Sequence, residues 1–390
     1  MIKKILSLIL CIIIVYASNI CAFADKDRPV AYVVMDANTS EILMAENENE
    51  KYFPASTTKI LTIALALQAN RLEEKTVLQD DVRLGIEWDC AHANLVRQEE
   101  ICLKDLIALA SMKSANDACN GIATMISGSH ESFVQLMNEQ VKNLGLENTH
   151  FENPNGLHHE NHYTTAKDLA LIMKYCVQID GFIEWTSLPE YTISTTNKHE
   201  AYTIKQNNPL LIKDSPYYIE GMQSCKTGFT DQAGYCMISF YEKDGQALII
   251  VVLNENEKNN RVSNTYSLLK QVLENGVFIK SNQLVEHIQL NNILNQYFSP
   301  FNKISYRYEC PVSGITTLSS ENIILTYKAY QHIITDSKLL ADVNVYHNQQ
   351  FLFTIKVYAE SWLVNKKLIY GVIMLIAGIV AIFMKKNKKG

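Results

Sequence analysis

Two residues near the start of the chain could act together as a nucleophile and its base. Ser56 and Lys59 stand three residues apart, between Pro54 and the apolar run 60–67. Pro54 suits a helix entry, and a run that is apolar almost all round predicts a buried helix. Residues three apart share one face of a helix, so the hydroxyl and the amine would lie side by side. The positive end of the helix dipole favours an alkoxide on Ser56 and disfavours an ammonium on Lys59. This pair predicts covalent catalysis in which Lys59 takes the hydroxyl proton.

Two further short motifs could complete such a site. Ser114-Ala115-Asn116 interrupts a helical pattern that starts at Leu103, and Lys226-Thr227-Gly228 occurs once, in a segment with strand character. Alone, the first would be interpreted as a helix cap, and the second could equally be a surface turn. The Ser-x-x-Lys spacing itself recurs by chance at Ser267 and Lys270. The ordered combination of all three motifs, at a helix start, an inter-helix bend and a strand, is far more specific. It predicts that three distant segments meet in one cleft.

The elements that must position these motifs form an α+β pattern. The segments before and after the helical region have strand patterns, with turn residues at 36–40 and a strong hairpin signal at Asp244-Gly245. A block of helical patterns at 103–144 is inserted between them. The two flanking sets of strands can form one antiparallel sheet, closed by a helix at 262–273. The expected strands are 31–35, 41–44, 221–228, 233–240 and 247–253.

With these motifs the chain resembles the D-alanyl-D-alanine carboxypeptidases, the low-molecular-weight penicillin-binding proteins. The resemblance covers about residues 28–278. It implies the β-lactamase-like, transpeptidase-like fold, an antiparallel sheet with an inserted helical block. Members of this family remove the terminal D-alanine from the pentapeptide stems of peptidoglycan and are acylated by penicillin, so the same substrate and the same inhibition by β-lactams are expected here. The landmarks that carry the resemblance are Asp36 with its turn, 54–59, 114–118, 153–157, 164–168, 226–230 and 233–236.

The resemblance and the side-chain chemistry together imply the catalytic roles. Ser56 Oγ would attack the carbonyl between two D-alanines, and Lys59 would accept its proton, which requires a neutral amine. Burial, the helix N-terminus and the charge of Lys226 would all lower the pKa of Lys59. Ser114 can relay a proton to the leaving amine. By the family pattern, the backbone N–H groups of Ser56 and Phe229 would form the oxyanion hole.

The remaining motif residues are expected to bind the substrate. Asn116 can hold its amide, while Lys226 and Thr227 would hold the free carboxylate of the last D-alanine. Gly228 would let the substrate backbone lie beside the strand. Many relatives have a glycine two residues before the lysine, where this chain has Ser224, so the strand entry is bulkier here.

No metal, cofactor or nucleic acid is expected. The net charge of −6 and the lack of a basic run inside the body argue against nucleic acid. His158, His159 and His162 lie near Glu160, but their spacing is not that of an H-E-x-x-H zinc motif. The nine cysteines are irregularly spaced without a C-x-x-C pair, which favours free buried thiols over a disulfide framework or a zinc site. Cys225, next to Lys226 on a strand, should point to the opposite face and into the core.

Both ends of the chain carry membrane signals. Residues 1–24 combine two lysines, an apolar run and an A-x-A site, which is typical of a cleaved secretory signal. Residues 368–384 carry no charge and predict a transmembrane helix at the short limit of length, and the lysine-rich tail 385–390 should stay in the cytoplasm. Between them we expect a catalytic domain at 28–278 and a small β-rich spacer domain at 279–358. The protein is therefore expected in the cell membrane with a single span and its catalytic body on the extracytoplasmic side.

The sequence leaves four alternative functions open. A transpeptidase or an endopeptidase would use the same motifs, because they do not specify the acceptor. A β-lactamase is less favoured, since no convincing E-x-x-L-N segment lies between the second and third motifs. A non-catalytic wall-binding protein is disfavoured because all the catalytic residue types are present.

Overall fold

The computed structural model describes residues 30–280, 304–309, 314–317, 323–329, 339–347 and 349–362. By its internal contacts the chain divides into two compact units, Met1–Gly276 and Val277–Gly390. The expected signal 1–24, the expected span 368–384 and the tail 385–390 lie outside the described residues. Within those residues, no helix is long and apolar enough to cross a membrane.

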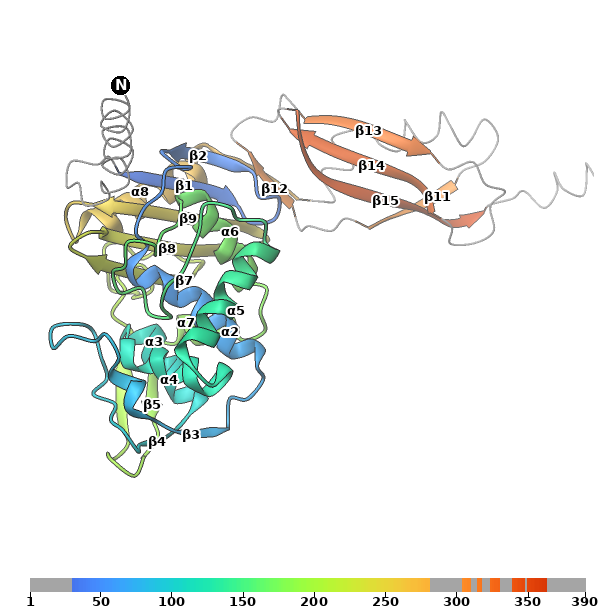
Figure 1. The fold of residues 1–390 in the computed structure, drawn as a ribbon. Coiled ribbons are helices and arrows are strands. Elements are labelled where there is room, and N and C mark those ends of the chain that lie inside the picture. The colour runs from blue at the N-terminus through green and yellow to red at the C-terminus, as the bar shows by residue number, and fades with distance from the viewer. Residues whose placement is uncertain are drawn as a thin grey trace, which may run out of the picture. The chain divides into compact units, whose positions relative to one another are not determined.

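The first unit is built on a five-stranded antiparallel sheet in the order β2-β1-β9-β8-β7 (Figure 1). The N-terminal hairpin joins the C-terminal strands through β1 and β9, with Val33 opposite Val251. Asp244 and Gly245 both have positive φ, at 55° and 89°, and form the tight turn between β8 and β9. The prediction of one antiparallel sheet made from both ends of the unit is therefore confirmed. The strands are β1 (Ala31–Asp36), β2 (Ile42–Glu46), β7 (Met222–Thr230), β8 (Gly234–Lys243) and β9 (Gln246–Glu255).

Helices cover both faces of this sheet, and β9 is accordingly apolar on both sides. Ile249 and Val251 belong to one buried cluster, which includes α6 (Ala166–Cys176), whereas Ile250 belongs to a second cluster with α8 (Asn260–Asn275). The helical block lies on the α6 side, as Figure 1 shows. Its helices are α2 (Lys59–Gln68), α3 (Leu103–Met112), α4 (Asn116–Ser127), α5 (His130–Asn143) and α7 (Phe182–Ser187).

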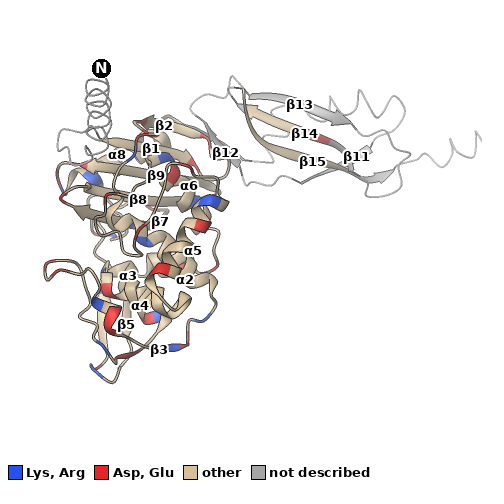
Figure 2. Cartoon of the chain, viewed as in Figure 1, with Lys and Arg blue, Asp and Glu red and all other residues tan. Residues whose placement is uncertain are grey.

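Short elements complete the first unit. The strands β3 (Lys75–Val77) and β4 (Glu100–Cys102) pair with each other, as do β5 (Glu190–Ile193) and β6 (Tyr202–Lys205). The 3-10 helix η2 (Asp80–Arg83) precedes the loop that leads to β4. Positions of Lys and Arg are interspersed with positions of Asp and Glu along the described part of this unit (Figure 2).

The described part of the second unit consists of strands. Four of them form an antiparallel sheet in the order β11-β15-β14-β13, and β10 pairs with β12. The core of the larger sheet contains Val343, Val345 and Ile355, which alternate along their strands as the sequence predicts. The expected strand at 284–288 lies outside the described residues. The strands are β10 (Val277–Lys280), β11 (Ile304–Glu309), β12 (Gly314–Thr317), β13 (Ile323–Ala329), β14 (Leu339–His347) and β15 (Gln350–Trp362).

Candidate active site

The candidate nucleophile lies on a tight turn, not in the first turn of an α-helix. Ser56 belongs to the 3-10 helix η1 (Ala55–Thr58), and α2 begins only at Lys59. Ala55 has a φ of +48°, a left-handed conformation that costs a non-glycine residue about 1 kcal/mol. This correction tightens the expected geometry, because three residues per turn align residues i and i+3 on one face.

Two glycines hold the turn against the rest of the unit. A Cβ on Gly228 in β7 would lie 2.8 Å from the Ser56 backbone nitrogen. A Cβ on Gly156, which has a φ of +82°, would lie 1.9 Å from the Ala55 carbonyl oxygen. Real Cβ atoms do not approach backbone atoms this closely, so both contacts require glycine. The nucleophile turn is thereby fixed between a sheet strand and the loop 153–157.

Lys59 is fully buried and points its amine at Ser56. Its Nζ lies 2.7 Å from Ser56 Oγ and 2.7 Å from Asn116 Oδ1, and it also donates to the Asn155 carbonyl oxygen. Burial lowers the pKa of Lys59 to about 8, against smaller opposing effects of nearby acidic groups. A neutral amine is therefore accessible near neutral pH, with Ser56 as one of its three hydrogen-bond partners.

The second and third motifs meet where Lys226 contacts the hydroxyl of Ser114. Ser114 lies between α3 and α4 with a φ of +55°, and its Oγ accepts a hydrogen bond from Lys226 Nζ at 2.9 Å. Lys226 Nζ also donates to the Thr227 carbonyl oxygen at 2.8 Å. Burial, followed by the charge of Lys59, holds the pKa of Lys226 well below its usual value. A negatively charged ligand at this point would restore the ammonium form.

The site opens into a cleft of about 660 Å³. One wall is β7 and the turn that follows it, and the other is formed by the loop after η2 and the start of α4. The predicted residues Ser56, Lys59, Ser114, Asn116, Lys226, Thr227, Gly228 and Phe229 come together here: six of them line the cleft, while the two lysines are buried beneath its surface. The six lining residues are Ser56, Ser114, Asn116, Thr227, Gly228 and Phe229.

Sequence reasoning missed two partners in the cleft. The Asn155 carbonyl oxygen accepts a hydrogen bond from Lys59 Nζ, whereas the sequence marks only the segment 153–157 as a landmark. Arg261 in α8 lines the cleft, donates from Nη1 to the Gly228 carbonyl oxygen at 2.7 Å and lies 5.3 Å from the centre of the Tyr235 ring. A single arginine at the start of a helix carries no pattern that would have marked it.

His162 supports the nucleophile turn. Its Nδ1 accepts the Glu152 backbone N–H at 3.2 Å, so the proton lies on Nε2, which is 2.9 Å from Thr58 Oγ1. Thr58 Oγ1 in turn donates to the Ala55 carbonyl oxygen at 2.8 Å. Burial lowers the pKa of His162 to about 3, so the ring is neutral in the folded state. Within the described residues, no group of His, Cys, Asp and Glu side chains could hold a metal ion.

The neighbours of Lys226 lie as their strand positions predict. Cys225 is buried in the cluster on the α8 side of the sheet, whereas Ser224 and Lys226 are buried on the other side. The cysteines of the described residues are free thiols, buried except for Cys90, which is half-buried and lines the cleft.

A comparison with known families decides what this arrangement is. The model of the D-alanyl-D-alanine carboxypeptidase family (Peptidase_S11) matches residues 22–257. The chain belongs to this family. It is 30% identical to D-alanyl-D-alanine carboxypeptidase DacF of Bacillus subtilis over 304 residues, which cover 74% of this chain and 76% of the relative. It is 33% identical to DacC of Escherichia coli over 250 residues, which cover 61% of this chain and 60% of that relative.

Other similar proteins extend the comparison. A D-alanyl-D-alanine endopeptidase of Pseudomonas aeruginosa is 29% identical over 245 residues, which cover 63% of this chain and 76% of that protein. Among solved structures, penicillin-binding protein 5 of Haemophilus influenzae superposes with a TM-score of 0.65 at 22% identity, covering 85% of this chain and 96% of that chain. PBP3 of Streptococcus pneumoniae superposes with a TM-score of 0.67 at 18% identity, covering 85% and 98%. These likenesses show the transpeptidase-like α+β fold.

Proposed function

We propose that this protein is a serine-type D-Ala-D-Ala carboxypeptidase that removes the terminal D-alanine from peptidoglycan pentapeptide stems. The observation that carries the proposal is the 2.7 Å contact between the buried Lys59 amine and Ser56 Oγ, at a cleft beneath which Lys226 is also buried. Family membership supports the substrate class, because the named relatives are D-alanyl-D-alanine carboxypeptidases.

Acylation begins when neutral Lys59 accepts the proton of Ser56 Oγ. The oxygen attacks the carbonyl carbon between the two D-alanines and forms a tetrahedral oxyanion. We assign the stabilisation of this charge to the backbone N–H groups of Ser56 and Phe229, and each such donor is typically worth about 3 kcal/mol of barrier. Gly228 leaves the Ser56 nitrogen open to the substrate, since any Cβ there would crowd it.

The proton that Lys59 took from Ser56 Oγ passes through Ser114 to the amine of the leaving D-alanine. Lys226 Nζ contacts Ser114 Oγ at 2.9 Å. The D-alanine carboxylate binds in front of Lys226 and Thr227 in β7. Arg261, from α8, donates to the carbonyl oxygen of Gly228, the next residue of that strand. The carboxylate supplies the charge that stabilises the Lys226 ammonium, so substrate binding and the charge state of Lys226 reinforce each other. Water then hydrolyses the acyl-enzyme, with Lys59 again accepting a proton.

The proposal is tested by incubating the full-length protein with a synthetic pentapeptide that ends in D-Ala-D-Ala. We expect release of one D-alanine per stem, and covalent labelling of Ser56 by penicillin. Ser56→Ala should abolish both, whereas Ser267→Ala, which removes the other Ser-x-x-Lys serine, should change neither. Release of D-alanine by Ser56→Ala, or labelling at another residue, would overturn the assignment.

A second candidate is cleavage or formation of stem cross-links. One similar protein is named an endopeptidase, and the motifs do not specify which acyl acceptor enters the cleft. Mass spectrometry of stem peptides after digestion of cross-linked peptidoglycan separates the activities. Loss of a single D-alanine supports the carboxypeptidase, whereas cleaved or new cross-links support the endopeptidase or transpeptidase.

We further propose that the protein is exported and anchored in the cell membrane by residues 368–384, with the catalytic unit on the extracytoplasmic side. The proposal rests on the charge-free run and the flanking lysines of the sequence. Fractionation of cells is the test: the full-length chain should sediment with membranes and be cleaved by protease added outside, and a chain ending at residue 360 should be released in soluble form.

A further inference from the structure

Trp88 is highly exposed to solvent and is next in the chain to residues of the cleft. Its side chain is 87% exposed, well above the next most exposed large apolar side chain of the described residues, Leu84 at 55%. An indole ring combines a large apolar surface with a polar N–H group, which suits it to binding at a partly wet surface.

Trp88 stands in the chain between two residues that line the catalytic cleft. Trp88 occupies the tip of a turn that is closed by a hydrogen bond from the Cys90 N–H to the Glu87 carbonyl oxygen at 3.2 Å. The residues on both sides of it, Glu87 and Asp89, line the same cleft as Ser56. A molecule that fills the cleft and extends past Glu87 or Asp89 reaches the segment that carries Trp88.

The loop that carries Trp88 is tied to the catalytic elements. The Asn116 N–H donates to the Ala91 carbonyl oxygen at 2.9 Å. The buried Asp117 carboxylate accepts from the backbone N–H groups of Ala93 and Leu95, each at 2.9 Å. The loop is thus hydrogen-bonded to the start of α4, the helix that presents Asn116 to Lys59.

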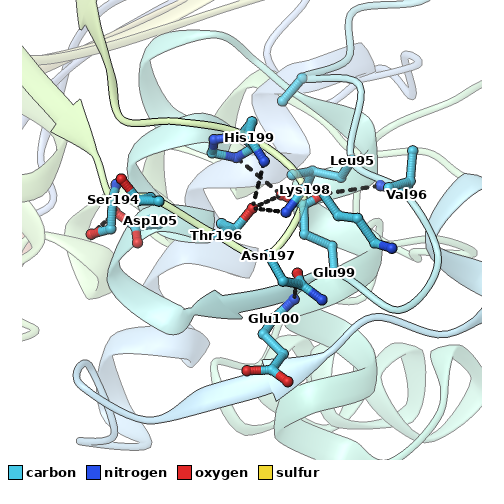
Figure 3. A network of polar contacts seen from close by, with 12 residues as sticks. Leu95, Val96, Glu99, Glu100, Asp105, Ser194, Thr196, Asn197, Lys198 and His199 are labelled. Atoms are coloured by element: carbon cyan, nitrogen blue, oxygen red, sulfur yellow. Dashed lines mark hydrogen bonds and ion pairs between the residues drawn. The ribbon is translucent and has the colours of Figure 1, made fainter.

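The far end of the loop is also held. The buried Glu99 carboxylate accepts from the Val96 N–H at 3.2 Å and from Thr196 Oγ1 at 3.0 Å, in the network of Figure 3. His199 Nε2 lies 3.0 Å from the same carboxylate, as an ion pair when that ring is protonated. Asn197 bridges the two segments, accepting from the Glu100 N–H at 2.9 Å and donating to the Gln98 carbonyl oxygen at 2.8 Å. These contacts pre-organise the loop, which favours a binding role for its tip.

The charged residues next to Trp88 indicate which kind of ligand could bind there. Glu87 and Asp89 are exposed carboxylates directly beside the ring. Buried centres of protein interfaces are depleted of Asp and Glu, and an anionic lipid or phosphate polymer would be repelled. A sugar ring fits both features, because its C–H face can pack on an indole while its hydroxyl and amide groups donate hydrogen bonds to carboxylates.

We propose that Trp88, with Glu87 and Asp89, binds the saccharide that carries the stem peptide, so that the substrate is the glycan-linked stem and not the free peptide alone. This inference rests on the proposed function, and it assigns the sugar to the Trp88 side of the cleft. Trp88 is a specificity-determining residue in this account and takes no part in the bond-breaking steps.

The test compares two substrates of the full-length protein: the pentapeptide stem alone, and the same stem attached to its N-acetylated disaccharide. We expect a lower KM for the disaccharide-linked stem. Trp88→Ala should reduce this preference about fivefold through KM, with kcat for the linked stem unchanged, and Trp88→Phe should restore most of it. Val77→Ala is the matched control, because Val77 is 45% exposed but lies in β3, away from the cleft lining.

Equal effects of Trp88→Ala on both substrates, or no effect on either, would overturn the proposal. A separate readout keeps it independent of activity: the peptide-free disaccharide should change the tryptophan fluorescence of the wild type and not that of Trp88→Phe. If the wild type releases D-alanine from neither substrate, the proposed function fails, while this fluorescence change still decides whether Trp88 binds the sugar.

Discussion

Lys59 and Lys226 are both buried amines, yet the proposed reaction needs them in opposite charge states. Lys59 must be neutral to accept a proton, and burial lowers its pKa to about 8. Lys226 must be charged to hold a carboxylate, although burial also holds its pKa well below the usual value. The substrate carboxylate resolves this conflict, because it stabilises an ammonium at Lys226 and leaves Lys59 as the base.

Arg261 should contribute to carboxylate recognition. We expect Arg261→Gln to lower kcat/KM for a peptide with a free C-terminal carboxylate by roughly 10- to 100-fold, since a charged hydrogen-bonding group is lost next to that carboxylate. For the same peptide with a C-terminal amide, the variant and the wild type should differ little. Lys270→Ala, on the same helix but half-exposed, is the control and should match the wild type. Equal losses on both peptides would assign Arg261 a structural role only.

His162 should make stability depend on pH. Its pKa is lowered to about 3 in the folded state, below the ordinary value near 6.5, so the unfolded chain binds the proton more readily. The stabilising contribution is complete above pH 6.5 and is lost as the pH falls towards 3, by on the order of 1 kcal/mol per pH unit. Denaturant unfolding of the wild type and of His162→Gln across this range measures the difference. The variant, which keeps a donor for Thr58 but has no titrating ring, should show a shallower decline.

The chemistry of single residues was predictable where side chains form patterns. The Ser-x-x-Lys, Ser-x-Asn and Lys-Thr-Gly motifs predict that Ser56, Ser114 and Lys226 meet, and the structure brings them together. The Asn155 carbonyl could not be predicted, because a backbone group leaves no trace in residue type. Arg261 could not be predicted either, since it reaches the cleft only through the packing of α8 on the sheet.

At the scale of elements, the nucleophile turn depends on close packing against its neighbours. Gly156→Ala should place a Cβ 1.9 Å from the Ala55 carbonyl oxygen, and Gly156 also has a φ of +82°. We expect a loss of at least about 3 kcal/mol in unfolding free energy and a large loss of penicillin acylation, because the turn that carries Ser56 must move.

Gly128→Ala is the matched control for this prediction. Gly128 has almost the same φ, +80°, but nothing lies within 4 Å of its missing Cβ. That variant should lose only about 1 kcal/mol from backbone strain and should keep normal acylation. Chemical denaturation and labelled penicillin measure both effects. Similar losses in the two variants would show that contact with Ala55 does not control the turn.

The elements themselves were largely predictable, because their patterns are long and regular. The hairpin at 31–44, the helical block and the strand 247–253 all appear where apolar periodicity places them. The detail at Ser56 was not predictable: an apolar helical run does not distinguish a 3-10 turn at 55–58 from an α-helix that starts at the same point. The left-handed φ of Ala55 and Ser114 is imposed by tertiary contacts at residues without a turn signature.

At the scale of the whole molecule, every residue that lines the cleft belongs to the first of the two compact units. A chain that ends at residue 276 should therefore acylate Ser56 with penicillin at a rate within about twofold of the full-length protein, because the chemistry is complete in that unit. Labelling with radiolabelled penicillin, quenched after set times, measures the rate, and circular dichroism checks that the shortened chain is folded. A folded but unreactive fragment would show that residues after 276 contribute to the site.

The pH dependence of penicillin acylation tests the central claim most directly. If Lys59 is the base, the second-order acylation rate of the full-length protein should rise about tenfold per pH unit below its pKa and level off above about pH 8, as its ammonium loses the proton. Lys59→Ala should lose this limb and almost all of the rate. A flat profile through pH 6–9, or a Lys59→Ala variant that is acylated at the wild-type rate, would contradict the account.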